Sequence, residues 1–405
     1  MLAGCGGSQP PIGAAGQPLN GTSARAVSSH HYESLYSFQG SYSDGAQPLA
    51  GLVALNGAFY GTTYGGGGYH NPGTVFQITE AGKERALFDF GYSGNDGDKP
   101  TSGLIALNET LYGTADGGGC CGIVYDITTS GQQSVIYDFQ GKPDADNPSG
   151  GLAAVNGALY GVTLRGGSGH PPLGQCRPRI YGCGAIFHVD TSGAERVLYS
   201  FNKAPRNGEF PVGSLVAING TLYGTTLNGG DLSACSGQGC GTVFSVTKSG
   251  RVRLLHSFKG PPYDAQSPNG LVALNNVLYG TGGGGTSGLG AAFSVTLSGN
   301  ETILHNFTGG SDGASPSAGL NVANDLLYGT TQKGGNDKNY CSSDGCGTVF
   351  EMSTSGTEQV LYRFRGYPDD GSDPNGYLTF VKGTLYGTTS AGGTYGDGTV
   401  FSLKP

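Results

Sequence analysis

Residues 32–405 are divided into short apolar runs that alternate with turn-forming residues. Each run is four or five residues long and rich in β-branched, aromatic or aliphatic side chains, with Gly, Pro, Asn or Ser at its ends. That pattern is typical of β-strands. No stretch sustains the apolar spacing of a helix. The first set of predicted strands comprises Leu35–Phe38, Gly51–Leu55, Ala58–Thr62 and Thr74–Ile78.

Two kinds of turn connect these runs into a meander. An Asn-Gly link joins the second run to the third and suits a type I′ hairpin, because both central residues of that turn need positive φ. The link occurs at Asn56-Gly57, Asn156-Gly157 and Asn219-Gly220, with Asn275-Asn276 and Lys382-Gly383 as variants. A Ser-Gly turn follows the last run in most sets, as at Ser130-Gly131, Ser192-Gly193 and Ser249-Gly250. Each set of runs therefore predicts a four-stranded antiparallel sheet.

Two phrases recur seven times along the chain. The first contains a Tyr-Gly pair, with its tyrosine at Tyr60, Tyr112, Tyr160, Tyr223, Tyr279, Tyr328 and Tyr386. The second is a Gly-Thr-Val-Phe-like strand that ends at Phe76, Tyr125, Phe187, Phe244, Phe293, Phe350 and Phe401. A period of about fifty residues indicates a repeat architecture. The units are 32–82, 83–131, 132–193, 194–250, 251–299, 300–356 and 357–405. Arranged radially, they predict an all-β, seven-bladed β-propeller.

The order of the runs predicts how the ring closes. The Gly-Leu-Val-Ala-Leu runs are expected to form the inner strands, and the run that opens each unit to form the outer strand of the preceding blade. The chain opens with such an outer run, Leu35–Phe38, and ends with the set from Gly376 to Leu403. We therefore expect the N-terminal strand to complete the last blade, which removes open edges. An open solenoid is the structural alternative.

A second ring of aromatic residues accompanies the one at the end of the Gly-Thr-Val-Phe strands. Its members close the outer runs: Phe38, Phe90, Phe139, Phe201, Phe258, Phe307 and Phe364. Burial of one aromatic side chain stabilises a fold by about 2–3 kcal/mol. The chain contains no Trp, so these rings are expected to form the core between blades. The alternative is that they serve as stacking platforms for a ligand.

The repeat resembles the bacterial tandem-repeat family called GloVer and is similar in layout to kelch-type propeller repeats. The shared pattern is Gly-Leu-Val, Asn-Gly, Leu-Tyr-Gly-Thr-Thr, Gly-Gly and Gly-Thr-Val-Phe, and it covers residues 32–405. Departures from it include Val162 in place of the first Thr and Gly282 in place of the second. The resemblance implies an exported protein held by an anchor. It implies no agreed activity and supplies no catalytic residues.

Composition and the N-terminal sequence limit the classes of partner and the cellular locations that we expect. Charged residues make up 12% of the chain and the net charge is −8, which disfavours a nucleic-acid partner. Leu2-Ala3-Gly4-Cys5 matches the bacterial lipoprotein box, in which Cys5 is lipidated, although the charged and apolar regions that normally precede it are missing. A chance match is the alternative. Residues 1–31 are otherwise rich in Gly, Ser, Pro and Ala and are expected to form a flexible tether. We expect an exported protein at the bacterial surface, outer membrane or extracellular space.

One face of the predicted propeller carries the long and variable loops, and such loops usually carry function. One set reads Asp-Gly-x-x-Pro or similar, with its aspartate at Asp44, Asp96, Asp144, Asp264, Asp312 and Asp370. Carboxylates suit calcium, but Asp, Gly and Pro form turns without a metal, and we favour that interpretation. The other set is Gly-rich and longest at 164–183. The candidate contact residues on these loops are Tyr64, Tyr69, His70, Arg177, Arg179, Tyr181 and Tyr340. Simple loop packing is the alternative.

Besides Cys5 there are eight cysteines, two in each of four units, and each pair lies before the Gly-Thr-Val-Phe strand of its unit. Their placement favours the pairs Cys176–Cys183, Cys235–Cys240 and Cys341–Cys346, which would staple single loops in an oxidising compartment. Cys120 and Cys121 would form a vicinal disulfide, for which loop rigidity, ligand contact and redox chemistry are all open. Zinc binding is disfavoured because the pairs lie in different blades.

Catalytic motifs are sparse. The histidines are scattered, and no H-E-x-x-H, G-x-S-x-G or Walker sequence is present. We therefore expect no cofactor and no metal. The leading hypothesis is a surface-anchored, non-catalytic scaffold that binds an extracellular glycan or protein through its loop-rich face. One alternative is self-assembly into a surface layer or filament. Another is a polysaccharide lyase or hydrolase at the mouth of the channel.

Overall fold

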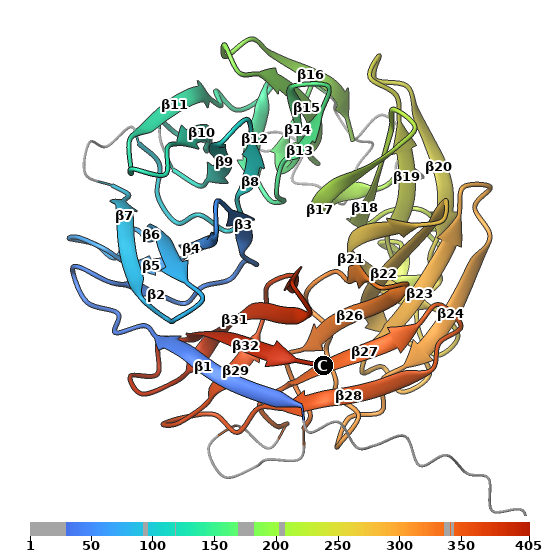
Figure 1. Ribbon diagram of the computed structural model, residues 1–405. Helices are drawn as coiled ribbons and strands as arrows, with labels where there is room; N and C mark the ends of the chain where they lie inside the picture. Colours follow the sequence, from blue (N-terminus) through green and yellow to red (C-terminus); the bar gives the residue numbers. More distant parts are fainter. Residues whose placement is uncertain are drawn as a thin grey trace, which may run out of the picture.

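The computed structural model describes residues 30–91, 96–117, 119–168, 182–201, 207–335, 341 and 344–405. Seven antiparallel sheets surround a central axis as the blades of a propeller (Figure 1). This confirms the predicted seven-bladed fold. The described residues contain no helix that is long and apolar enough to cross a membrane.

The strands run in order from the channel to the rim, with the innermost strand split in blades 3 and 7. Blade 1 holds β3 (Val53–Leu55), β4 (Ala58–Thr63), β6 (Thr74–Thr79) and β7 (Glu84–Asp89). Blade 2 holds β8 (Ile105–Leu107), β9 (Thr110–Ala115), β10 (Ile123–Ile127) and β11 (Gln133–Asp138). Blade 3 holds β12 (Ala145–Pro148), β13 (Ala153–Val155), β14 (Ala158–Gly166), β15 (Ala185–Asp190) and β16 (Glu195–Ser200).

The remaining blades repeat this plan. Blade 4 holds β17 (Glu209–Ile218), β18 (Thr221–Asn228), β19 (Thr242–Val246) and β20 (Val252–Ser257). Blade 5 holds β21 (Ala265–Leu274), β22 (Val277–Gly284), β23 (Ala291–Thr296) and β24 (Glu301–Asn306). Blade 6 holds β25 (Asn321–Ala323), β26 (Leu326–Thr331), β27 (Thr348–Ser353) and β28 (Glu358–Arg363). Blade 7 holds β29 (Gly371–Pro374), β30 (Thr379–Val381), β31 (Thr384–Gly392), β32 (Thr399–Lys404) and β1 (His31–Ser37). A small extra pair, β2 (Gly45–Ala46) with β5 (Gly65–Gly66), and a short 3₁₀ turn, η2 (Cys235–Gly237), lie in the loops.

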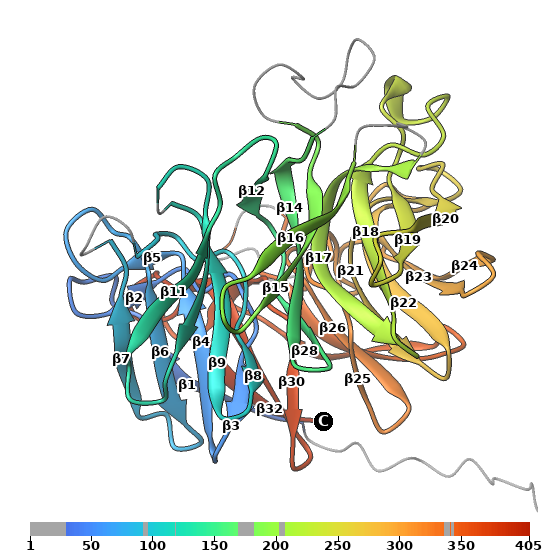
Figure 2. The ribbon, with the colours of Figure 1, turned by 90° about the horizontal axis from the view of Figure 1, so that it is seen from above.

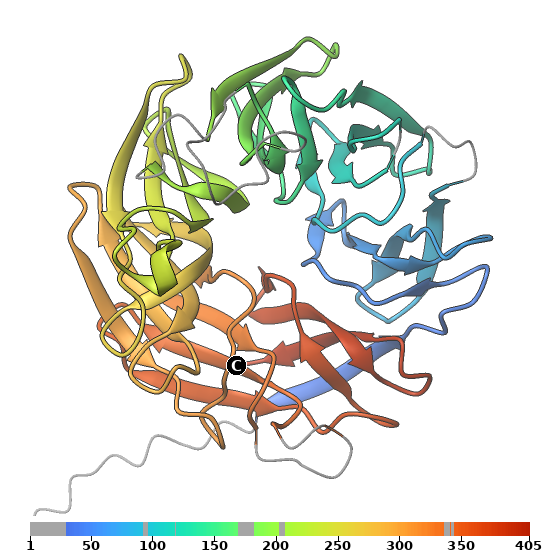
Figure 3. The ribbon, with the colours of Figure 1, turned by 180° about the vertical axis from the view of Figure 1, so that it is seen from behind.

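The N-terminal strand closes the ring, as the sequence predicts. β1 pairs antiparallel with β32, from His31 opposite Lys404 to Ser37 opposite Thr399. Blue β1 therefore lies along red β32 in Figure 1, and the view from behind in Figure 3 shows the same junction. The hydroxyl of Thr388 in blade 7 also donates to the carbonyl of Ala50 beside blade 1, at 2.8 Å. The first and last blades are thus joined, which excludes the open solenoid.

Aromatic pairs form the core between blades. Each phenylalanine that follows an outer strand meets the aromatic residue of the third strand in the next blade, as in the Phe38–Phe76 pair with ring centroids 5.1 Å apart and an interplanar angle of 70°. Both side chains are fully buried. The equivalent pairs are Phe90–Tyr125, Phe139–Phe187, Phe201–Phe244, Phe258–Phe293, Phe307–Phe350 and Phe364–Phe401. Both circular sets of seven aromatic residues therefore pack the core between blades, and their side chains are inaccessible to a ligand.

The long loops gather on one side of the disc and the short hairpin turns on the other (Figure 2). Asn56 and Gly57 have φ values of 50° and 79°, which matches the predicted tight hairpin. We call the side with the long loops the loop-rich face. It consists of the links from each outer strand to the next inner strand and from each second strand to the third.

Candidate binding site on the loop-rich face

Exposed tyrosines are concentrated on the loop-rich face. Five tyrosines among the described residues are more than half exposed, and every one lies in a loop of this face: Tyr42 (68%), Tyr69 (80%), Tyr263 (87%), Tyr367 (51%) and Tyr395 (55%). Single exposed aromatic side chains are common on protein surfaces, so those that lie in contact with one another are the informative ones. Of this group, only Tyr69 is among the candidate contact residues predicted from the sequence.

The loops between blades 7 and 1 bring three of the aromatic side chains into contact. The rings of Tyr42 and Tyr69 lie 5.6 Å apart at 53°, and the rings of Tyr69 and His70 lie 6.1 Å apart. Backbone hydrogen bonds hold the two loops together, since Gly68 N–H donates to the Tyr42 carbonyl at 2.8 Å. We call Tyr42, Tyr69 and His70 the tyrosine cluster. It offers an open aromatic surface on a backbone that is fixed by hydrogen bonds.

The other predicted contact residues are placed differently. Tyr64 is half-buried, and the ammonium group of Lys99 lies 5.7 Å from its ring centroid in a cation–π contact. It therefore packs against the next loop and does not extend the tyrosine cluster. Arg177, Arg179, Tyr181 and Tyr340 lie outside the described residues, as do Cys5 and Cys176.

A cavity of about 320 Å³ lies in the central channel, toward the loop-rich face. Its lining comes from the start of each inner strand, where one position is Gly51, Gly103, Gly151, Ser214, Gly270, Gly319 and Tyr377 in the seven blades. The phenol of Tyr377 extends across the channel, because a Cβ at Gly270 would overlap its hydroxyl. Burial raises the pKa of Tyr377 to about 12, and a backbone hydrogen bond from Ser214 acts in the opposite direction.

The described lining of this cavity is uncharged. Its described lining residues include Ser, Thr and Asn side chains and many backbone groups, but no carboxylate, imidazole, amine or guanidinium. Tyr377 is the one ionisable side chain among them, and its raised pKa keeps it protonated at neutral pH. General acid–base catalysis needs a group that changes protonation near the working pH. The sequence analysis missed Tyr377 because its position is glycine in most other units.

Disulfides stiffen three of the described loops. Cys120 bonds to Cys121, Cys235 to Cys240, and Cys341 to Cys346. Cys183 is disulfide-bonded as well. Each bridge lies between the second and third strands of its blade, so the loops on this face are restrained where they emerge from the sheet.

Three aspartates of the Asp-Gly loops stabilise the turns in which they lie by accepting three hydrogen bonds each. Asp44 accepts hydrogen bonds from the backbone N–H groups of Gln39 (2.8 Å) and Gly45 (2.7 Å) and from the hydroxyl of Tyr36 (3.0 Å). Asp144 and Asp370 accept the same three bonds in their own blades. These contacts support the turn interpretation of the loops.

A half-buried glutamate lies beside some of these aspartates. Burial, with the negative charge of Asp44 second, raises the pKa of Glu84 to about 7, although its hydrogen bond with Tyr36 acts in the opposite direction. Glu195 beside Asp144 and Tyr137 repeats the arrangement, again with a pKa of about 7. The folded protein therefore holds these protons at pH values where the unfolded chain has released them. Each glutamate should destabilise the fold as the pH rises from about 4.5 to about 7.

We expect the substitution Glu84→Gln to leave stability unchanged at pH 5 and to increase it at pH 8. Glutamine imitates the protonated acid, and the chain itself has Gln133 at the equivalent position of the next blade. The gain at pH 8 should be about 1 kcal/mol, less than the full pKa shift implies, because a half-buried carboxyl is partly screened. Urea unfolding at both pH values measures it, with the exposed Glu33→Gln as control. An equal effect at both pH values would contradict the assignment.

Comparisons with known proteins agree with this geometry. In solved structures, the chain is similar to a virginiamycin B lyase from Staphylococcus aureus, with 16% identity, a TM-score of 0.58, and 93% of this chain and 99% of that chain covered. It is also similar to a puromycin-hydrolyzing peptidase from Mycobacterium tuberculosis, with 11% identity, a TM-score of 0.50, and 88% and 52% covered. At these identities the similarity shows the propeller fold alone. No curated protein sequence matches the chain significantly.

A repeat family matches the chain over almost its whole length. The matched regions are residues 13–171, 121–281 and 232–405, and together they include every blade. This confirms the resemblance drawn from the Tyr-Gly and Gly-Thr-Val-Phe phrases. The chain belongs to the Gloeobacter/Verrucomicrobia repeat family.

Proposed function

We propose that this protein is a non-catalytic scaffold that binds an extracellular polysaccharide through its loop-rich face. The observation that carries the proposal is the tyrosine cluster, in which the exposed rings of Tyr42 and Tyr69 are in contact. The apolar C–H faces of sugar rings pack on aromatic rings, while the phenol hydroxyl remains free to hydrogen-bond. Tyrosine also loses little side-chain entropy on binding, because it has few rotatable bonds.

The charge of the face suits a neutral or weakly charged polymer. Only 12% of the residues are charged, and the tyrosine cluster contains no carboxylate or ammonium group. A ligand held by strong ion pairs would call for a denser array of charges. Stacking and hydrogen bonds are therefore the expected sources of affinity.

The expected location supports the same proposal. Disulfides persist in oxidising compartments, and three of them restrain loops of this face. Lipidation at Cys5, followed by a tether to residue 31, would hold the propeller at the outer surface of a bacterium. An anchored scaffold of this kind could keep a polysaccharide close to the cell.

An array of soluble polysaccharides, followed by calorimetric titration of the hits, tests the proposal. We expect saturable binding that the double substitution Tyr42→Ala/Tyr69→Ala weakens at least about tenfold, which corresponds to about 1.4 kcal/mol. Tyr263→Ala is the matched control, because it removes an equally exposed tyrosine from a loop between blades 4 and 5. It should weaken binding much less.

Three other outcomes would overturn the proposal. An array without a hit would remove the glycan as ligand. New reducing ends or unsaturated products in a hit polymer would establish an enzyme. Large particles in light scattering that disappear when residues 1–29 are deleted would establish self-assembly.

A further inference from the structure

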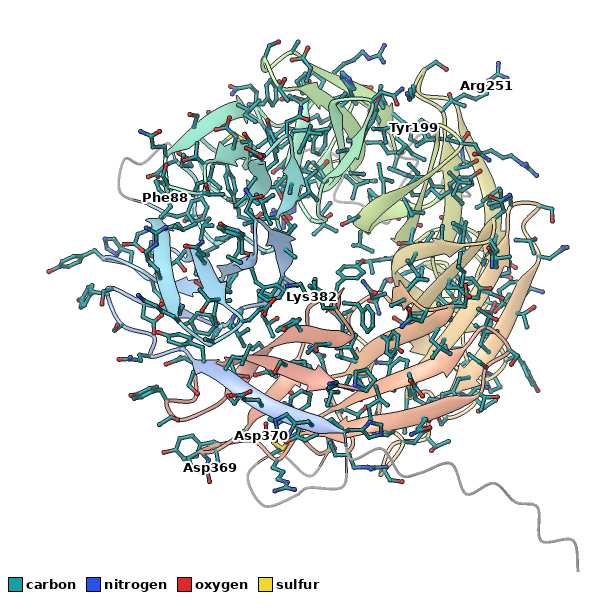
Figure 4. The ribbon with its side chains drawn as sticks, viewed as in Figure 1. Phe88, Tyr199, Arg251, Asp369, Asp370 and Lys382 are labelled. Atoms are coloured by element: carbon teal, nitrogen blue, oxygen red, sulfur yellow. A yellow bond between two sulfur atoms is a disulfide. The ribbon has the colours of Figure 1, made fainter. Side chains whose placement is uncertain are left out.

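Three positions meet at the rim where neighbouring blades join. The first is on the outer strand of one blade, the second is the aspartate of the loop that follows, and the third begins the outer strand of the next blade. Their residues, taken in order around the ring, are Tyr36–Asp44–Glu84, Phe88–Asp96–Gln133, Tyr137–Asp144–Glu195, Tyr199–Asn207–Val252, His256–Asp264–Glu301, His305–Asp312–Glu358 and Tyr362–Asp370–Tyr32. Figure 4 marks Phe88, Tyr199 and Asp370 around the rim, each at a different junction.

The residues at these positions differ between the seven copies, and so do their contacts. Where the second residue is Asn207, the third is the apolar Val252, and Asn207 donates to the Tyr199 hydroxyl at 3.1 Å. In the tyrosine copies with an aspartate, the phenol donates to the carboxylate, at 3.0 Å for both Tyr36 and Tyr137. Only two copies replace the aromatic residue with histidine, and both keep Asp and Glu.

At the junction of blades 4 and 5 the replacement leaves a buried imidazole nitrogen without a partner. His256 Nε2 lies 3.7 Å from Asp264 Oδ2, too far for a hydrogen bond. His256 Nε2 and Glu301 Oε1 are both buried from solvent, and neither has a hydrogen-bond partner. An unpartnered glutamate oxygen recurs at Glu84, Glu195 and Glu358, so the unpartnered imidazole nitrogen is what distinguishes this junction. An unsatisfied buried polar atom is costly, so a group that satisfies both atoms at once would stabilise this junction.

The same three side chains have the geometry of a ligand set. One ligand atom each from His256, Asp264 and Glu301 lies within 4.8 Å of the other two. The Asp264 carboxylate is oriented by the backbone N–H groups of Lys259 (2.8 Å) and Ala265 (2.7 Å), which is the kind of outer support that fixes a metal ligand. One imidazole nitrogen and two carboxylate oxygens suit Zn²⁺, and the ion would balance the two negative charges.

We propose that His256, Asp264 and Glu301 bind a divalent transition-metal ion, with Zn²⁺ as the best match, and that the ion links blade 4 to blade 5. The ligands come from β20, the loop after it and β24, so binding would join two sheets that share no strand pairing. No metal was expected from the sequence, because the histidines are scattered and no metal-binding motif is present. The proposal is independent of the polysaccharide proposed above.

The copy at His305, Asp312 and Glu358 is the weaker site. His305 Nε2 already lies 3.0 Å from Asp312 Oδ1, in hydrogen-bond contact. The other oxygen of Asp312 accepts from both the backbone N–H and the hydroxyl of Thr308. The positive charge of Arg363 also acts on Glu358. A cation would have to displace a formed hydrogen bond and sit near another positive charge, so its affinity is lower.

The experiment titrates Zn²⁺ into the full-length, tag-free protein after treatment with a chelator, with the disulfides intact. We expect one tighter and one weaker site by calorimetry. The substitution His256→Tyr should abolish the tighter site, and His305→Tyr should spare it. Tyrosine is the residue that the chain itself places beside Asp and Glu at other junctions, so both variants should fold. Glu301→Gln should weaken Zn²⁺ binding at the tighter site at least tenfold. It should still fold, because Gln133 occupies the equivalent position at another junction.

Two further measurements make the result decisive. Zn²⁺ should raise the melting temperature of the wild type and of His305→Tyr much more than that of His256→Tyr, which keeps only the weaker site, because a ligand that binds only the folded state stabilises it. Co²⁺ in place of Zn²⁺ should give an absorption spectrum that differs from that of the hydrated ion and is lost in His256→Tyr. The proposal is overturned if the wild type binds no Zn²⁺, or if His256→Tyr binds it with unchanged affinity and stoichiometry.

Discussion

Deletion of residues 1–38 is expected to abolish the stable folded ring. It removes β1, which is the outer strand of blade 7, and leaves the edge of β32 unpaired. It also removes Tyr32, whose ring stacks on Tyr362 at 3.9 Å, and the fully buried Phe38. Loss of a buried aromatic side chain alone costs about 3–5 kcal/mol. The whole strand should therefore exceed the total stability of about 5–15 kcal/mol that is typical of a folded protein.

Circular dichroism during thermal melting, together with size-exclusion chromatography, checks this expectation. A protein that begins at His30 is the control, because it keeps the complete strand and should melt cooperatively like the full chain. A synthetic peptide of residues 30–40, added in excess, should restore folding of the truncated protein by pairing with β32. A truncated protein that melts at the temperature of the full chain would show that β1 is dispensable and that the ring is closed by side-chain packing alone.

The sequence predicts the fold because its signals are local and repeated. Each Asn-Gly link and each Gly-Thr-Val-Phe strand defines one hairpin, and seven repetitions leave few other architectures. The ends of strands are less certain. β1 begins at His31, before the predicted Leu35, because pairing with β32 extends it. β3 begins at Val53, after the predicted Gly51, because Gly51 lies against the backbone of Tyr377 at the channel.

The sites were harder to predict because they depend on residues that are distant in the chain. Tyr42 and Tyr395 lie in loops that the sequence analysis interpreted as turns or glycine-rich links, and the exposure of their rings follows only from the arrangement of those loops. His256 and Glu301 belong to different blades, so spacing within one unit gives no sign of their contact. A position-by-position alignment of the seven units could have found the three rim positions, because it shows where His256 and His305 replace a tyrosine or phenylalanine.

The substitution Gly61→Ala is expected to destabilise the protein by about 1–3 kcal/mol, the usual cost of overpacking a core. The Tyr-Gly phrase places this glycine on β4, opposite Phe76 on β6. A Cβ at position 61 would lie 2.6 Å from Cζ of Phe76 and 2.9 Å from a methyl group of Leu52, closer than real contacts allow. Every blade has the same arrangement, with its glycine at Gly61, Gly113, Gly161, Gly224, Gly280, Gly329 and Gly387. The missing side chain makes room for the ring.

Urea unfolding measures this cost, and two companions identify its cause. Gly103→Ala is the control, since its Cβ would come no closer than 3.2 Å to any neighbour. In the double variant Gly61→Ala/Phe76→Leu the shorter side chain leaves space for the new methyl group, so the two effects should be less than additive. Additive effects would show that the glycine is needed for its backbone alone. Less than additive effects would mean that the Tyr-Gly phrase is repeated because the core between blades requires it. The loop-rich face and the rim would then be the regions where selection for function can act.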